Sequence, residues 1–384
     1  MGLGARTIFS RRAFLQLGGY GVLAAPAILR AAPAAAALGR DIGSMLIFGF
    51  SGTTVNSDSV RALALALSMR WAGGVHFTGD NIGSRDDVLR LTSLFRRSGS
   101  QVLLAIDHEG GSVQRLRSRH GVTPIPGARS VASRLDVDEA RSLYAMAGAE
   151  LSAAGFNLNL APVADLDDPR NPIIGRHGRS YSSDPIVVAA YASACIDGFL
   201  EAGIGSAVKH FPGHGLSRGD THLGPVDITS TWRASELVPF NNLIAADRAF
   251  AVMVGHLTHD YFRGRPASLS PIAIQLLIRR ILQYRGLVVT DDLDMRAISA
   301  IAGQEEAVVS AIAAGNDLIL ISNSRNPDPD LPRQAVNWIV KAIVDGRIPR
   351  HRIDDSVGRL RRAKDRTFAV SASTADTPEA DMNE

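Results

Sequence analysis

Eight short apolar runs, each rich in β-branched residues, recur along the chain with helical hydrophobic patterns between them. Strands that alternate with helices form parallel pairs joined by crossover helices, and eight such units close a barrel. We therefore predict an α/β fold, a (β/α)8 TIM-type barrel with a single catalytic domain. The runs begin at Met45, Gly73, Gln101, Phe156, Gly203, Ala249, Gly286 and Asn316.

Polar residues follow directly after several of these runs. In a (β/α)8 barrel the catalytic groups lie where strands end and the following loops begin. An open, doubly wound sheet also places ligands at the carboxyl ends of its strands, but the number and spacing of the runs favour closure. The polar residues at these ends are Asp107, His108, Glu109, Asp165, Lys209, His210, His256, Asp291 and Asp292.

Composition limits the class of protein. With 384 residues, 46% hydrophobic and 21% charged, the chain can bury a large core and does not resemble a disordered protein. The formal net charge of +3 is small and the arginines are scattered, so nothing indicates nucleic-acid binding. The single cysteine, Cys195, excludes an intramolecular disulfide, and its apolar helical surroundings predict a buried core residue rather than a nucleophile.

The N-terminus carries a targeting pattern. The segment Ser10-Arg11-Arg12-Ala13-Phe14-Leu15 precedes a small-residue apolar run that ends near Ala37, and it resembles a twin-arginine export signal. Pro26, Arg30 and Pro33 interrupt the run, which favours a cleaved signal over a retained membrane anchor. We expect a periplasmic or secreted protein that has no contact with the membrane after cleavage.

These patterns divide the chain into three parts. Residues 1–37 are the predicted signal peptide, 38–369 the barrel, and 370–384 a polar, disordered tail. The barrel is expected to end in an amphipathic helix between Asp345 and Lys364.

The stretch KHFPGHGLSRGDTH, Lys209 to His222, combines a Lys-His pair at a strand end with Asp220 and His222 in a glycine-rich loop. Histidine exchanges protons near neutral pH, and a carboxylate two residues away can fix its tautomer and raise its basicity. The pair suits general acid/base chemistry. For an isolated D-x-H, the alternative is a capping aspartate beside an ordinary loop histidine.

This stretch resembles the central motif of glycoside hydrolase family 3, in the branch of single-domain β-N-acetylglucosaminidases, where K-H-F-P-G-H-G precedes D-[ST]-H by four residues. The segment DHEGGSVQRL resembles the family's D-x-E-G-G-x-V-Q-R, with His108 and Ser112 at the variable places. The single-domain branch often has glutamine and arginine there. The resemblance implies a barrel without the second α/β domain found in many members.

The resemblance assigns the nucleophile to Asp291, which follows Val288, Val289 and Thr290 at the family's [ST]-D position. A retaining glycosidase needs a nucleophilic carboxylate on one face of the sugar and a proton donor on the other. Asp291 would form a covalent glycosyl-enzyme. The neighbours Asp292 and Asp294 suggest a metal site, but adjacent strand residues point apart, so we expect them to hydrogen-bond the loop instead.

The resemblance leaves the proton donor to His222. Two-domain relatives commonly supply a glutamate from the second domain, whereas here His222, oriented by Asp220, would assist the leaving group and then deprotonate the attacking water. The predicted substrate-binding residues are Asp107, Arg115, Arg179, Lys209 and His210, with His214 and His256 as further candidates. Structural ion pairs are the alternative for the charged residues, and loop or core packing is the alternative for His214 and His256.

Together these features predict an exported, monomeric, retaining exo-β-N-acetylhexosaminidase that needs no cofactor and no metal. Its substrate would be a glycan containing N-acetylglucosamine, from peptidoglycan fragments or chitin-like oligomers. Alternatives on the same scaffold are a β-glucosidase or xylosidase and a β-N-acetylglucosaminide phosphorylase, because a histidine acid/base tolerates an anionic acceptor. A sugar-binding protein without activity would be expected to lack Asp291 or His222. A zinc metallohydrolase is a remote alternative, with the ligands His210, His214, His222, His256 and Asp291.

Overall fold

The computed structural model describes residues 36–324 and 326–375. All eight predicted strands form, and each pairs in parallel with its neighbours in the order β11-β9-β7-β6-β3-β2-β1-β12. A bridge between Val289 and Leu318 joins β11 to β12. The predicted (β/α)8 barrel is therefore confirmed. The strands are β1 (Leu46–Phe48), β2 (Gly74–Phe77), β3 (Leu103–Ile106), β6 (Leu158–Asn159), β7 (Gly205–Phe211), β9 (Ala251–Val254), β11 (Leu287–Thr290) and β12 (Ile319–Ile321).

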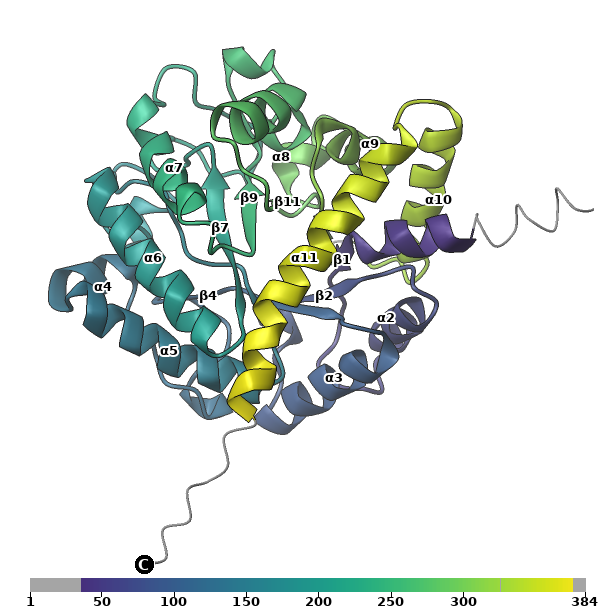
Figure 1. The fold of residues 1–384 in the computed structure, drawn as a ribbon, viewed down its shortest axis with the longest axis horizontal. Coiled ribbons are helices and arrows are strands. Elements are labelled where there is room, and N and C mark those ends of the chain that lie inside the picture. The colour runs from purple at the N-terminus through teal and green to yellow at the C-terminus, as the bar shows by residue number, and fades with distance from the viewer. Residues whose placement is uncertain (1–35, 325, 376–384) are drawn as a thin grey trace, which may run out of the picture.

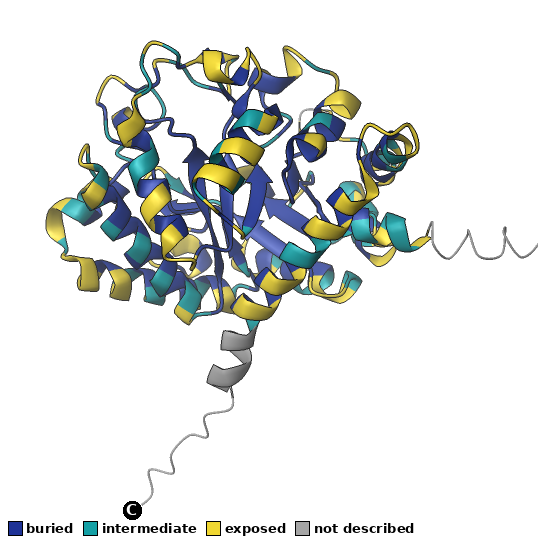
Figure 2. Cartoon of the chain, turned by 45° about the horizontal axis from the view of Figure 1, so that its top comes forward, coloured by how far each residue is buried: buried dark blue, intermediate teal, exposed yellow. Residues whose placement is uncertain are grey.

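Helices surround the sheet (Figure 1), and every residue of the eight strands is buried, as expected where a parallel sheet is covered on both faces (Figure 2). Residues 36–44 form the first helix. The others are α2 (Asp58–Ser68), α3 (Arg85–Ser98), α4 (Ala128–Arg134), α5 (Val137–Ala153), α6 (Pro185–Glu201), α7 (Leu237–Ala245), a π-helix (Ile272–Ile281), α8 (Arg296–Ser299), α9 (Gln304–Ala314), α10 (Leu331–Val344) and α11 (Arg350–Ala375).

Local signals explain where several helices start. Ser84 caps α3 by accepting a hydrogen bond from the amide of Asp87, and Asp136 caps α5 in the same way through Glu139. Asp184 caps α6, whose first residue is Pro185, and proline is favoured at that position. Cys195 lies buried in α6, as its apolar surroundings predicted.

Two short strand pairs lie outside the barrel sheet, among the loops that follow its strands. The strands β4 (His108–Gly110) and β5 (Val113–Gln114) pair in antiparallel fashion just after β3. The strands β8 (Val226–Asp227) and β10 (Leu257–Thr258) pair in parallel and join the loop after β7 to the loop after β9. These pairs fix the loops above the carboxyl ends of the barrel strands.

Helix α11 crosses the opposite end of the barrel, where the strands begin (Figure 1). Asp317, buried before β12, accepts hydrogen bonds from Arg352, Arg359 and Ser356 of this helix. The helix starts at Arg350 rather than near Asp345, because the chain turns at 345–346 and stays non-helical through 349, and it continues past the predicted boundary at 369.

The predicted signal peptide and tail fall mostly outside the described residues, which begin at 36 and end at 375. Within 36–324 and 326–375, no helix is both long enough and apolar enough to cross a membrane.

Candidate active site

The predicted site residues come from the carboxyl ends of the barrel strands, which meet at one end of a parallel barrel. Asp107 follows β3, and Lys209 and His210 lie in the last three residues of β7. His256 lies two residues after β9, and Asp291 directly follows β11.

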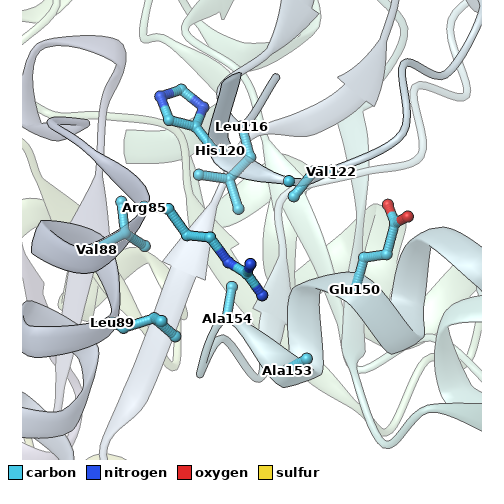
Figure 3. Close-up of a pocket in the computed structure, with 10 residues that line it drawn as sticks. Arg85, Val88, Leu89, Leu116, His120, Val122, Glu150, Ala153 and Ala154 are labelled. Atoms are coloured by element: carbon cyan, nitrogen blue, oxygen red, sulfur yellow. The ribbon is translucent and has the colours of Figure 1, made fainter. Parts of the chain in front are cut away.

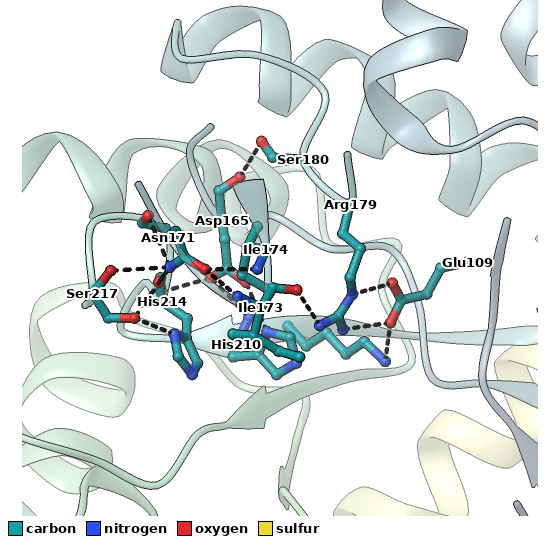
Figure 4. Close-up of polar contacts among 12 residues, drawn as sticks. Glu109, Asp165, Asn171, Ile173, Ile174, Arg179, Ser180, His210, His214 and Ser217 are labelled. Atoms are coloured by element: carbon teal, nitrogen blue, oxygen red, sulfur yellow. Dashed lines mark hydrogen bonds and ion pairs between the residues drawn. The ribbon is translucent and has the colours of Figure 1, made fainter. Parts of the chain in front are cut away.

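Lys209 forms the centre of a buried charge network. Its Nζ lies 2.7 Å from Oδ1 of Asp107 and 2.7 Å from Oε1 of Glu109. Glu109 in turn accepts two hydrogen bonds of 2.8 Å from Nε and Nη2 of Arg179 (Figure 4). Burial alone would raise the pKa of Glu109, but Arg179 and Lys209 lower it to about 2. The four side chains are therefore held in their charged forms.

Asp107 is the most exposed member of this network, with a side chain that is 15% exposed. Burial acts to raise its pKa, but Lys209, His76 and Arg115 bring it well below the usual range. Its Oδ2 lies 3.1 Å from Nε2 of His76 and 3.5 Å from Arg115, whose side chain is 33% exposed. Asp107 and Arg115 are thus placed where a ligand could reach both. His76 was not predicted, although it is a polar residue within the otherwise apolar strand β2.

Arg179 has a different setting. It is buried, and it bonds Glu109 twice and donates to the carbonyl oxygen of Ile173 at 3.1 Å. This is the structural ion pair that we considered as the alternative to substrate binding. A contact between Arg179 and substrate stays a prediction.

Asp165 organises the two histidines of the HFPGH segment. Its Oδ2 lies 2.7 Å from Nδ1 of His210, and its Oδ1 accepts from the amides of His210 at 3.2 Å and His214 at 2.8 Å (Figure 4). Burial acts to raise the pKa of Asp165, but the nearby His210 and His214 leave it below the ordinary value. Asp165 therefore fixes the ring of His210 through Nδ1 and leaves Nε2 for other contacts.

His214 is held inside the loop. Its Nδ1 lies 2.7 Å from Oγ of Ser217, and Nδ2 of Asn171 donates to its carbonyl oxygen at 2.6 Å (Figure 4). Burial lowers the pKa of His214 to about 4, with a further contribution from His210. These contacts match the alternative in which His214 orders the loop. Asn171 was not predicted, because its role depends on contacts 43 to 46 residues away.

The Asp220 and His222 side chains form a pair. Nδ1 of His222 lies 2.6 Å from Oδ1 of Asp220, which also accepts from the His222 amide at 2.9 Å. The His222 side chain is 59% exposed, whereas that of Asp220 is 19% exposed. Because Nδ1 is engaged with Asp220, Nε2 is the ring nitrogen available for proton transfer.

Three histidines lie close enough to Asp291 to act on its charge. Burial acts to raise its pKa, but His256, His210 and His222 together bring it below the ordinary value, so its carboxyl group is ionised at neutral pH. Its Oδ1 accepts from the amide of Asp292 at 2.8 Å. The loop of His222 and the end of β11 are therefore close enough for electrostatic interaction.

His256 and Asp292, which lie near Asp291, form hydrogen bonds with other protein groups. His256 engages Oγ of Ser268 through Nδ1 and the carbonyl oxygen of Asp292 through Nε2, both at 2.8 Å. Both ring nitrogens are thus occupied by protein groups, as expected for a structural histidine. Oδ1 of Asp292 accepts from the amides of Ser322 at 2.8 Å and Asp294 at 3.0 Å, which is the loop hydrogen bonding expected for this residue.

Within the described part of the chain, no group of three or more His, Cys, Asp or Glu side chains is arranged to hold a metal ion. A separate cavity of about 170 Å³ lies between α3 and α5, outside the barrel (Figure 3). It contains none of the predicted site residues. Its lining is Arg85, Val88, Leu89, Leu116, His120, Gly121, Val122, Glu150, Ala153 and Ala154.

Two β-hexosaminidases are similar in sequence to much of this chain. It is 37% identical over 257 residues to a β-hexosaminidase of Tolumonas auensis, covering 66% of this chain and 76% of that protein. It is 32% identical over 302 residues to a β-hexosaminidase of Idiomarina loihiensis, covering 75% of this chain and 88% of that protein.

Solved structures of proteins with related names are also similar to this chain. A glycoside hydrolase family 3 β-N-acetylglucosaminidase from Paenibacillus sp. str. FPU-7 superposes with a TM-score of 0.78 and 35% identity, over 90% of this chain and 64% of that chain. The chain thus spans less than two thirds of that protein. A β-N-acetylhexosaminidase from Beutenbergia cavernae superposes with a TM-score of 0.75 and 29% identity, over 85% of this chain and 98% of that chain. The model of the glycosyl hydrolase family 3 N-terminal domain matches residues 51–363, so the chain belongs to this family and is a glycoside hydrolase.

Proposed function

We propose that this protein is a retaining exo-β-N-acetylhexosaminidase that removes terminal N-acetylglucosamine from peptidoglycan fragments or chitin-like oligomers. The observation that carries the proposal is the placement of the Asp220 and His222 pair within electrostatic range of the ionised Asp291. The names of the relatives support the choice of sugar. The choice of peptidoglycan fragments or chitin-like oligomers follows from the expected export, because an exported enzyme would meet these glycans outside the cytoplasm.

In the first step, the carboxylate of Asp291 attacks the anomeric carbon and forms a glycosyl ester. Nε2 of His222 donates its proton to the departing oxygen, while Asp220 stabilises the positive ring through Nδ1. In the second step, the now neutral His222 removes a proton from water, which attacks the same carbon and releases the sugar with retained configuration. A histidine acid avoids placing a second buried carboxylate beside Asp291, which would repel it.

Binding of the sugar is assigned to the polar groups around Asp291. Asp107, held ionised by Lys209, accepts from ring hydroxyls, and Arg115 beside it donates. His210, oriented by Asp165, presents Nε2. Fixed donors and acceptors of this kind hold the substrate in the reactive orientation.

Initial rates on nitrophenyl β-N-acetylglucosaminide and nitrophenyl β-glucoside test the proposal, with wild type, Asp291→Ala and His222→Ala compared. We expect turnover of the N-acetylglucosaminide, abolished in Asp291→Ala and strongly reduced in His222→Ala. A preference for the glucoside, or wild-type rates in Asp291→Ala, would contradict it. Added phosphate separates hydrolysis from phosphorolysis, because a phosphorylase would be accelerated and would release a sugar 1-phosphate.

We also propose that the protein is exported through the twin-arginine pattern at Arg11 and Arg12, which lies outside the described residues. The test is cell fractionation of the full chain and of the double variant Arg11→Lys, Arg12→Lys. Export predicts wild-type protein outside the cytoplasm in a shortened form, with the variant retained at full length. An identical distribution of the two proteins would contradict the proposal.

A further inference from the structure

Glu236 is a buried carboxyl group beneath the loop that carries Asp220 and His222, and the reaction proposed above does not use it. It ends a 3-10 turn (Ala234–Glu236) directly before α7, and it is 1% exposed. Among the described residues, no Lys, Arg or His forms an ion pair with it. A buried carboxyl group without a cation is costly unless hydrogen bonds compensate for its burial.

Those contacts go to the loop backbone. Oε2 of Glu236 accepts hydrogen bonds from the amide of Gly215 at 2.8 Å and from the amide of Leu216 at 3.2 Å. The preceding amide, that of His214, donates to Asp165 at 2.8 Å. Three consecutive amides of the loop therefore point at two buried carboxyl groups, one after β6 and one before α7. The start of the loop is therefore held on both sides by hydrogen bonds to buried side chains.

Glycines allow this close approach. At Gly213, where φ is +115°, a Cβ atom would lie 2.5 Å from Cβ of Glu236 and 2.8 Å from its Oε2. At Gly215 a Cβ atom would lie 2.2 Å from the carbonyl oxygen of Leu166. The loop backbone is thus packed between the turn that carries Glu236 and the segment after β6, and neither glycine can be replaced without displacing one of them.

We propose that Glu236 is a positioning residue: its carboxyl group fixes the start of the loop, at Gly215 and Leu216, so that Asp220 and His222 reach Asp291. The inference rests on the proposed function, because the proposed function is what makes Asp220 and His222 of this loop a catalytic pair. Asp220 lies four positions after Leu216, so a displaced start of the loop would also displace the Asp220 and His222 pair. A misplacement of about 1 Å is enough to lower a catalytic rate about 100-fold.

The charge state of Glu236 decides which substitution conserves its role. Burial and, to a smaller extent, the neighbouring Asp165 carboxylate together raise the pKa of Glu236 to about 8. At neutral pH the carboxyl group of Glu236 is therefore mostly protonated, and its uncharged oxygen accepts the two hydrogen bonds from the loop amides. Glutamine offers the same neutral acceptor in the same shape, whereas leucine fills the space without an acceptor.

The experiment compares Glu236→Gln with Glu236→Leu. We expect Glu236→Leu to lower kcat about 10- to 100-fold with little change in KM, and Glu236→Gln to stay within about threefold of wild type. In a His222→Ala background, Glu236→Leu should have little further effect, because the two changes act through one group. Asp317→Asn, a buried carboxyl change at the opposite end of the barrel, is the control for loss of stability alone.

Amide hydrogen exchange over residues 213–222 gives a readout that needs no substrate. We expect faster exchange in Glu236→Leu than in both Glu236→Gln and Asp317→Asn. Unchanged exchange in Glu236→Leu, or an equal kcat loss with and without His222, would overturn the inference. If wild type turned over no N-acetylglucosaminide, the proposed function would fail, and the exchange result would still decide whether Glu236 holds the loop.

Discussion

The amide of Ala297 donates a hydrogen bond to the carbonyl oxygen of Thr221, with 3.2 Å between the two atoms. Thr221 lies between Asp220 and His222, and Ala297 lies in α8, six residues after Asp291. Both residues are buried. The bond therefore ties the loop of the predicted acid/base to the segment that follows the predicted nucleophile.

Removing the acid/base should have an effect that depends on the leaving group. In His222→Ala, we expect kcat/KM for a phenyl N-acetylglucosaminide to fall about 100- to 10,000-fold, because its leaving oxygen needs a proton. A dinitrophenyl glycoside, which leaves without protonation, should lose much less. The measurement is kcat/KM for a series of leaving groups, with Asp220→Asn as the milder companion. An equal loss for every leaving group would remove His222 from the acid role.

Lys209 and Arg115 both contact Asp107, but Lys209 is more deeply buried. Substituting Lys209 should therefore cost more unfolding free energy than substituting Arg115. Lys209 has a side chain that is 4% exposed and bonds two carboxylates, so Lys209→Met should cost about 3 kcal/mol of unfolding free energy. Arg115→Met breaks a longer, partly exposed contact and should cost less than about 1 kcal/mol. Denaturant unfolding of the two variants measures the difference, and equal losses would show that burial does not decide the strength of these contacts.

Arg179→Lys tests whether Arg179 serves the fold or the substrate. Lysine cannot reproduce the two parallel bonds to Glu109, so we expect a loss of about 1 to 3 kcal/mol in unfolding free energy. KM should change little, because the described bonds of Arg179 go to protein groups. A large rise in KM with unchanged stability would instead support a direct contact with substrate.

Two buried histidines make the fold sensitive to acid. Burial lowers the pKa of both His108 and His214 to about 4. Between about pH 6.5 and pH 4 the unfolded chain binds these protons while the folded chain does not, so stability falls as the pH falls. Each histidine contributes about 1.4 kcal/mol per pH unit within that window.

Denaturant unfolding at pH 7, 6 and 5 measures this slope. Among the described residues, neither ring nitrogen of His108 has a hydrogen-bond partner, so His108→Leu should be tolerated and should give a shallower slope. The same slope in wild type and His108→Leu would show that His108 is not the source.

Much of the fold could be predicted because its signal is local. Each barrel strand is a short apolar run buried on both faces, so eight runs were enough to predict eight parallel strands. The charged residues at strand ends were found for the same reason, since strand direction brings those ends together. Lys209 and Asp107 lie 102 residues apart in sequence but 2.7 Å apart in space.

The roles of the residues that hold the site residues in place could not be predicted. The position of Asp165 at a strand end was recognised, but its role was not, and Glu236 was not recognised at all. Both residues accept hydrogen bonds from backbone amides of the loop, and a backbone amide gives no sequence signal. His76 reaches Asp107 across neighbouring strands, and no spacing rule links the two. Arg179 illustrates the converse, because a charged residue in a motif is compatible with either a ligand contact or an ion pair until its partner is known.

Covalent trapping tests the central assignment most directly. Purified protein would be incubated with a 5-fluoro N-acetylglucosaminyl fluoride, which forms the glycosyl-enzyme but slows its hydrolysis, and then digested and analysed by mass spectrometry. We expect one added sugar on the peptide that contains Asp291, and none in Asp291→Ala. A sugar on another residue, or turnover of substrate with no trapped adduct, would contradict this assignment.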